Sequence, residues 1–188
     1  MTIKISLILA TVGRKDDLMI FFNSLRGTGF SDYEVIVVDQ NDDDRLVPIV
    51  QTMLASGMDI VHLRAHEKSL SKARNLGLGV AKYDLIGFPD DDCWYGAGLI
   101  EQLKQRMAQD ANMDGVMVHW EEQLQNPPVE RILSFARLIR FREVPVASIT
   151  LFLKKSCIAK IGEFDHRFGV KQYFGASEET DFILRALK

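Results

Sequence analysis

Cysteine is scarce in this chain, and its scarcity excludes two classes of protein. The 188 residues include two cysteines, Cys93 and Cys157, which lie far apart in the sequence. A disulfide-stapled domain or a structural zinc site needs more thiols at closer spacing. Two isolated thiols are typical of a reducing compartment, where each behaves as a small apolar side chain.

Long apolar runs are also missing. No stretch approaches the roughly 20 apolar residues that a membrane-spanning helix needs. The apolar run at 5–10 is too short for a signal peptide and has no small-residue cleavage site after it. We therefore expect a cytoplasmic protein, and contact with the inner face of the membrane stays compatible with that location.

Positive charge is not in surplus. Lysine and arginine number 23 and aspartate and glutamate 26, which gives a net charge of −3 at pH 7. Because nucleic-acid binders normally carry a basic surplus, nucleic acid is not an expected partner, whereas a nucleotide held through a metal ion is. With 47% apolar residues, the length suits a single domain, and we expect it to span residues 1–188.

Short apolar runs alternate with segments of helical period along the chain. The runs predict strands at 5–10, 34–39, 59–64, 84–88, 115–119 and 148–153. The intervening segments predict helices at 15–26, 45–56, 71–81 and 97–109. The first two strands are apolar at nearly every position, as in strands covered on both faces. This alternation predicts parallel pairing and an α/β sheet flanked by helices.

Acidic residues follow two of the predicted strands. Asp39 ends the strand at 34–39, and Asp90, Asp91 and Asp92 follow the strand at 84–88 in the stretch "FPDDDCWY". Ligands of open α/β sheets gather at the carboxyl ends of the strands, so both acidic groups should lie at one edge. The spacing of Asp90 and Asp92 lets both carboxylates reach one hard cation, Mg²⁺ or Mn²⁺, that carries a diphosphate.

The acidic run has two other interpretations. A solvated turn accounts for acids in a loop, but not for their position directly after a strand. A calcium-binding EF-hand loop would place Asp90, Asp92 and Glu101 at its first, third and twelfth positions. Its sixth position requires glycine and holds Tyr95, and a strand precedes the run, so this interpretation is rejected.

These segments, taken together, resemble the family 2 glycosyltransferases. The resemblance covers nearly the whole chain and rests on five segments in order: "SLILATVGRKDDL", "VIVVDQNDDD", "SLSKARNLGL", "FPDDDCW" and "GEFDHRFGVKQYFGASEETDFILRAL". It implies the GT-A fold, a Rossmann-like and mostly parallel sheet in one domain. The family's domain generally continues beyond the point that corresponds to Lys188, which implies a shortened chain or an abbreviated member.

The resemblance also implies roles for individual residues. A nucleotide-sugar donor would contact Thr11, Arg14, Asp39, Arg74, Asp90 and Asp91, with Asp39 at the nucleobase. Asp92, together with Asp90, would bind the Mn²⁺ or Mg²⁺ cofactor.

The late segment carries the expected catalytic base. Where the family usually has Glu-Asp, this chain has Glu178-Glu179, so Glu179 takes the position of the base with one more methylene, and Asp181 is the second candidate. The alternative is that these are first-turn acids of a helix capped by Ser177, which the helix dipole favours. Likewise, Ser69 or Ser71 could cap the helix that carries Arg74.

The implied reaction is inverting transfer of a sugar to the hydroxyl of a sugar or lipid-linked acceptor, in polysaccharide or cell-surface glycan synthesis. Two alternatives stay open: a non-catalytic nucleotide-sugar binding module and a sugar nucleotidyltransferase. The latter wants a glycine-rich basic loop near the N-terminus, and "ATVGRKDD" is a poor match.

Three segments have two interpretations each. Residues 131–143, "RILSFARLIRFRE", form a basic amphipathic pattern that suits either contact with an anionic membrane surface or a lipid-phosphate acceptor or, as we favour, a helix packed on the sheet. Trp94 and Tyr95 either line a sugar site or belong to the core. The loop at 169–177 is either a lid over substrate or an ordinary surface loop.

Overall fold

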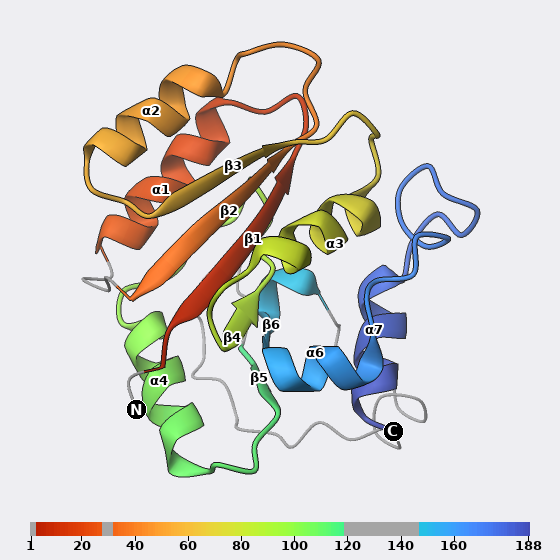
Figure 1. Ribbon diagram of the computed structural model, residues 1–188. Coiled ribbons are helices and arrows are strands. Elements are labelled where there is room, and N and C mark those ends of the chain that lie inside the picture. Colours follow the sequence, from red (N-terminus) through yellow and green to blue (C-terminus); the bar gives the residue numbers. More distant parts are fainter. Residues whose placement is uncertain (1–2, 28–31, 119–146) are drawn as a thin grey trace, which may run out of the picture.

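The computed structural model describes residues 3–27, 32–118 and 147–188. They form an α/β fold around a six-stranded sheet with the strand order β3-β2-β1-β4-β6-β5 (Figure 1). The strands are β1 (Ile5–Thr11), β2 (Tyr33–Asp39), β3 (Ile60–Arg64), β4 (Leu85–Gly87), β5 (Gly115–Met117) and β6 (Leu151–Lys154). Every predicted strand is therefore present, with boundaries that differ by a few residues.

The sheet is mixed rather than wholly parallel. β1 pairs in parallel with β2 and β4, and β2 with β3. β6 runs antiparallel to both β4 and β5, which differs from the parallel pairing that the alternation of strands and helices predicts. β6 also starts later than expected, because residues Ser148–Thr150 form a 3-10 turn in which the Thr150 amide donates to the Ala147 carbonyl oxygen (3.0 Å).

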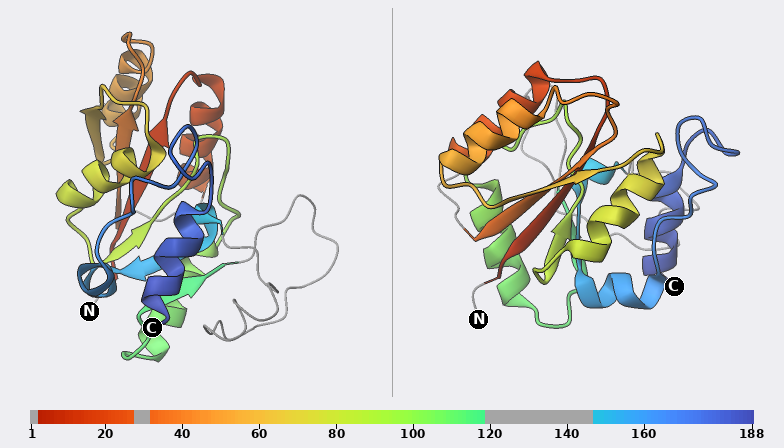
Figure 2. Two further views of the ribbon diagram at one scale, coloured as in Figure 1. Left: turned by 90° about the vertical axis from the view of Figure 1, so that its right-hand side faces the viewer. Right: turned by 45° about the horizontal axis from the view of Figure 1, so that its top comes forward.

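Helices cover both faces of the sheet (Figures 1 and 2). α1 (Asp16–Gly27), α2 (Val47–Ala55) and α4 (Leu99–Gln109) pack on the face that carries Ile5, Leu7 and Leu9 of β1. α3 (Leu70–Val80), α6 (Lys155–Ile161) and α7 (Glu178–Ala186) pack on the face that carries Ile8. Alternate residues of β1 thus enter opposite cores, which is why the strand is apolar at nearly every position.

Close packing of α3 on β1 positions the start of α3 at the carboxyl edge of the sheet. A Cβ atom added to Gly77 would lie 2.3 Å from Cγ2 of Ile8, so glycine lets the helix backbone approach the strand. The N-terminus of α3 is capped by Ser69, whose hydroxyl oxygen accepts from the Lys72 amide (3.5 Å). Arg74 follows in the second turn of α3 and is buried.

Among the described residues, each helix is too short or too polar to cross a membrane. The basic stretch at 131–143 lies outside the described residues.

Candidate active site

The two acidic stretches lie at one edge of the sheet, on either side of β1. Thr11, the last residue of β1, is in register with Asp39, the last residue of β2. On the other side of β1, Ala10 forms a parallel bridge with Asp90. The carboxyl ends of three neighbouring strands therefore place both stretches where a ligand of an open α/β sheet binds.

Asp39 is fully buried and its carboxylate is fully occupied. Oδ1 accepts from the main-chain and side-chain nitrogens of Asn41 (2.9 and 2.7 Å), and Oδ2 accepts from His62 Nε2 (3.0 Å) and Arg64 (2.8 Å). Burial raises the pKa of Asp39, but the hydrogen bonds from Asn41 and His62 and the charge of Arg64 outweigh it and leave the pKa below its ordinary value. The carboxylate points toward β3, away from the convergence with Asp90 and Asp92 that the sequence suggests.

Asp91 and Asp92 are held by the loop that follows β1. The Thr11 hydroxyl donates to Oδ2 of Asp91 (2.6 Å), and the Arg14 guanidinium lies 3.2 Å from Oδ1 of Asp91 and also contacts Asp92. Burial raises the pKa of Asp91 against the opposing effects of Thr11 and Arg14. Four of the residues that the resemblance assigns to the donor and cation are therefore in mutual contact.

Arg74 joins the acidic run to the start of α7. Its guanidinium lies 3.3 Å from Asp90, 3.6 Å from Glu178 and 3.2 Å from Glu179. It also donates to the Ser148 hydroxyl (2.6 Å). Three elements that are distant in sequence thus meet at one buried cation, and the proposed base is brought beside the acidic run. Sequence reasoning missed Ser148, which stands in no motif and carries no signal of its own.

The start of α7 separates the two candidate bases. Glu179 faces Arg74, whereas Asp181 forms an ion pair with Arg185 one turn later (2.9 Å). In the alternative interpretation these acids lie in the first turn of a helix capped by Ser177. They do lie in the first turn and Ser177 stands at the N-cap, but its φ of 79° is left-handed and its side chain makes no capping hydrogen bond. Burial, together with the charges of neighbouring carboxylates, raises the pKa of Glu178 even though Arg74 opposes the shift.

Negative charge exceeds positive charge in this cluster. The carboxylates of Asp90, Asp91, Asp92, Glu178 and Glu179 surround the guanidiniums of Arg14 and Arg74. Burial raises the pKa of Asp90, and Glu179, Asp92 and Asp91 add to the effect of burial against the attraction of Arg74. Such a cluster of hard oxygen donors suits a divalent cation.

The described residues do not form a complete metal cage. No three described histidine, cysteine, aspartate or glutamate side chains converge as ligands of one ion. Asp90 and Asp92 alone would leave positions open on a hard cation, and phosphate oxygens commonly take such positions on Mg²⁺. A cation at this edge would therefore need ligands beyond these two carboxylates, and phosphate oxygens are one source of them.

The residues after the acidic run separate into core and surface. Tyr95 is buried and packs edge-on against Phe21, with ring centroids 6.1 Å apart. The Tyr95 hydroxyl is buried without a hydrogen-bond partner among the described residues. Trp94, by contrast, is 67% exposed. Of the two residues, Trp94 alone remains available to a ligand.

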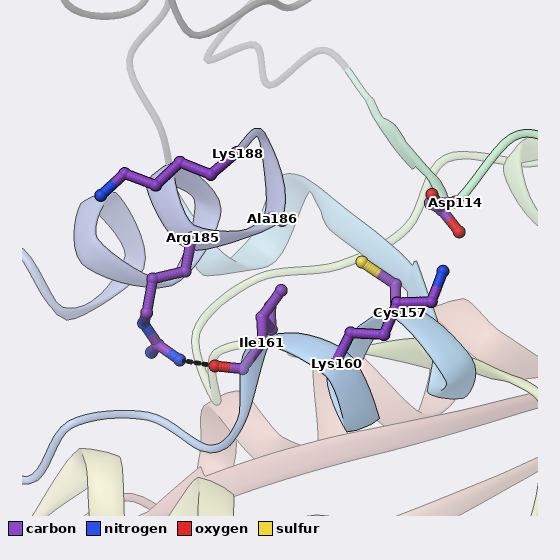
Figure 3. Close-up of a pocket in the computed structure, with 7 residues that line it drawn as sticks. All are labelled: Asp114, Cys157, Lys160, Ile161, Arg185, Ala186 and Lys188. Atoms are coloured by element: carbon purple, nitrogen blue, oxygen red, sulfur yellow. Dashed lines mark hydrogen bonds between the residues drawn. The ribbon is translucent and has the colours of Figure 1, made fainter.

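A cavity of about 500 Å³ lies at the opposite edge of the sheet (Figure 3). Asp114, just before β5, lines it together with residues of α6 and α7, among them Cys157, Lys160 and Arg185. The Arg185 guanidinium donates hydrogen bonds to the carbonyl oxygens of Ile161 and Glu163. The cavity is lined by none of the expected donor, metal or catalytic residues, so we assign the chemistry to the acidic edge instead.

Comparison with known proteins identifies the family and the fold. The family model described as "Glycosyl transferase family 2" matches residues 6–159. An uncharacterized glycosyltransferase of Haemophilus influenzae is 23% identical over 98% of this chain and 62% of its own length. The hyaluronan synthase of Pasteurella multocida is 40% identical over 62 residues, which are 32% of this chain and 6% of that protein.

Solved structures share the fold. S. aureus TarS 1–349 in complex with UDP-GlcNAc superposes with a TM-score of 0.79 at 17% identity, over 98% of this chain and 53% of that one. The mannosyltransferase PcManGT from Pyrobaculum calidifontis, in complex with GDP-Man and Mn²⁺, gives a TM-score of 0.68 at 16% identity, over 88% of this chain and 48% of that one. The chain spans 62% of the Haemophilus relative and about half of each of these two structures. On the match of the family model, the chain belongs to glycosyl transferase family 2.

Proposed function

We propose that residues 1–188 form the catalytic domain of an inverting, metal-dependent glycosyltransferase. It transfers a sugar from a nucleotide-diphosphate sugar to the hydroxyl of a sugar or lipid-linked acceptor. The observation that carries this proposal is the acidic cluster at the carboxyl edge of the sheet, where Arg74 holds Glu179 beside Asp90. The UDP-GlcNAc and GDP-Man bound by structural neighbours support a nucleotide-sugar donor.

The charge of the cluster supports a requirement for Mn²⁺ or Mg²⁺. A diphosphate would bring further negative charge to a place where carboxylates already outnumber guanidiniums. Asp90 and Asp92 would hold a divalent cation there, and the bound cation would neutralise charge on the leaving diphosphate. The Mn²⁺ in the mannosyltransferase complex is in accord with this assignment.

The donor nucleotide would lie along the loops that follow β1 and β2. Arg14, whose side chain is 43% exposed, supplies a cation that can turn from Asp92 to the diphosphate. Thr11 and Asp91 form the wall beneath it through their hydrogen bond. Asp39 reaches the nucleobase when one of its four present donors gives way, since a carboxylate accepts about four hydrogen bonds.

Glu179 is placed to act as the general base. It takes the proton of the acceptor hydroxyl as that oxygen attacks the anomeric carbon, while the bond from this carbon to the diphosphate oxygen breaks on the opposite side. Arg74 orients the Glu179 carboxylate through their 3.2 Å hydrogen bond. Asp181 is a weaker candidate because its partner is not Arg74 of the acidic cluster but Arg185, which donates to the carbonyl oxygens of Ile161 and Glu163.

The replacement Glu179→Gln tests this function, with Asp181→Asn as its matched control. Turnover is measured with UDP-, GDP-, dTDP- and CDP-sugars in the presence of Mn²⁺. We expect Glu179→Gln to lower turnover about 10²–10⁴-fold while donor affinity is kept, and Asp181→Asn to change it little. Equal effects of the two variants would refute the choice of base.

The same assay separates the alternatives. A binding module would bind a nucleotide sugar without consuming it, and a nucleotidyltransferase would release pyrophosphate from a nucleoside triphosphate and a sugar phosphate. We further propose that the chain serves polysaccharide or cell-surface glycan synthesis in the cytoplasm. The short match to a hyaluronan synthase supports this assignment.

A further inference from the structure

A short aromatic arm, residues 168–174, projects from the body of the protein beside the start of α3 (Figures 1 and 2). The Gly169 amide donates to the Phe174 carbonyl oxygen (2.9 Å), and the Phe174 amide donates to the Arg167 carbonyl oxygen (2.8 Å). These two hydrogen bonds close the base of the arm. The arm therefore has a defined shape that does not depend on a ligand.

The arm exposes apolar side chains that have no role in either core. Tyr173 is 87% exposed, Val170 64% and Phe174 46%. The Phe174 ring lies between two neighbours, stacked on Phe168 (4.9 Å between centroids) and edge-on to Tyr173 (4.8 Å). Contiguous exposed apolar groups mark interaction sites, and an aromatic ring held by its neighbours binds without much loss of conformational freedom.

The base of the arm is built into the candidate active site. The Ser71 hydroxyl donates to the Phe168 carbonyl oxygen (2.9 Å). A Cβ atom on Gly169 would lie 3.7 Å from the Glu178 carboxyl carbon. Glu178 in turn lies 3.6 Å from Arg74, the residue that holds Glu179. Glu178 thus lies between Gly169 at the base of the arm and Arg74, which holds the proposed base Glu179.

The reach of the arm is short. Adjacent Cα atoms are about 3.8 Å apart, and Tyr173 adjoins Phe174, which is hydrogen-bonded to Gly169. Tyr173 therefore lies within roughly 10 Å of Gly169, and a Cβ atom on Gly169 would lie 3.7 Å from the Glu178 carboxyl carbon. Because Glu179 follows Glu178 at the start of α7, we expect a saccharide of a few residues to reach from Tyr173 to Glu179.

We propose that the aromatic arm is a subsite for the acceptor saccharide, in which Tyr173 stacks on the face of a sugar ring. The carbon-bound hydrogens on the face of a pyranose are attracted by the negative face of an aromatic ring. This subsite rests on the proposed glycosyl transfer, because the acceptor hydroxyl must lie at Glu179 while another ring of the same molecule lies at Tyr173. A saccharide is the favoured occupant because the arm starts at the candidate base.

Saturation-transfer NMR with the methyl glycosides of glucose, galactose, N-acetylglucosamine and mannose tests the subsite. We expect the wild-type protein to saturate the ring protons of at least one glycoside, and Tyr173→Ala to weaken that binding roughly tenfold. Tyr173→Phe keeps the ring and should bind as the wild type does. Val170→Ala is the control for a change in the same arm that removes no ring.

Two results of the NMR experiment would overturn the subsite. In the first, the wild-type protein saturates none of the glycosides; in the second, Tyr173→Ala saturates them as strongly as the wild type does. Dimerisation that Tyr173→Ala abolishes would assign the arm to a second copy of the chain, and sedimentation with anionic phosphatidylserine vesicles would assign it to a membrane. Because Tyr173 is exposed, its replacement leaves the fold intact.

Donor turnover distinguishes failure of the subsite from failure of the proposed function. Tyr173→Ala should raise the KM for a saccharide acceptor roughly tenfold, whereas Val170→Ala, which removes no ring, should leave both that KM and donor hydrolysis by water unchanged. If no nucleotide sugar is consumed by the wild type, the proposed function fails whatever the glycosides show. If donors are consumed and the KM is unaffected, the subsite alone fails.

Discussion

Replacement of Arg74 by methionine probes the buried part of the site. The change keeps an unbranched side chain of similar length and removes the cation that Glu178 and Glu179 share. The Arg74 side chain is 2% exposed, Glu178 7% and Glu179 18%, so water replaces the lost partner at most in part, and only at Glu179. Breaking a buried ion pair from one side costs about 3–5 kcal/mol. The half-exposed Asp90 should add little to this loss.

Urea denaturation at neutral pH measures the loss, with Arg14→Met as the matched control. Arg14 contacts Asp91 and Asp92, but its side chain is 43% exposed, so its removal should cost less than about 1 kcal/mol. Adding Glu178→Gln to Arg74→Met should restore part of the free energy of unfolding, because it removes an unpaired buried charge. Equal losses for Arg74→Met and Arg14→Met would refute the reasoning.

Three further predictions concern the free energy of unfolding. Gly77→Ala should destabilise the protein by about 1–3 kcal/mol, because its Cβ would lie 2.3 Å from Ile8. Gly79→Ala, with open space around its Cβ, should stabilise it by about 0.5–1 kcal/mol. Urea midpoints of the two variants that move in the same direction would contradict this. Tyr95→Phe should stabilise by about 1 kcal/mol in the same assay, because it removes a hydroxyl buried without a partner among the described residues; a loss would reveal a partner. Asp39→Asn should lower the free energy of unfolding most above the ordinary carboxyl pKa of 3.8, and this loss should shrink as the pH falls through the lowered pKa of folded Asp39. A loss that grows in acid would contradict the lowered pKa.

The sequence predicted the arrangement of the backbone better than the direction of side chains. β1 and β2 are apolar at nearly every position because each has a core on both faces, and that pattern is visible in the letters. Asp39 and Asp90 were expected at one edge of the sheet, and they lie there, in register with the last two residues of β1 on either side of that strand. The pattern could not predict the direction in which the Asp39 carboxylate points. Arg64 stands directly opposite Asp39 in the β2–β3 register and draws it away from the acidic run.

Other features left no periodic signal. α6 spans seven residues, Lys155–Ile161, too few to show a helical period after a strand. The direction of β6 depends on tertiary pairing with β4, which an apolar run does not encode. Arg74 was expected beside the nucleotide from its segment, but its burial between Asp90 and Glu179 arises from contacts with α7, which begins about a hundred residues later.

Calorimetric titration of UDP-, GDP-, dTDP- and CDP-sugars into the protein, with and without Mn²⁺, tests the central claim most directly. We predict heat of binding for at least one of these donors when Mn²⁺ is present, and loss of that heat when Mn²⁺ is withheld or when Asp92 is replaced by asparagine. Binding of none of the donors with Mn²⁺, or binding that Asp92→Asn and the removal of Mn²⁺ leave unchanged, would contradict a cation-held diphosphate at this edge of the sheet.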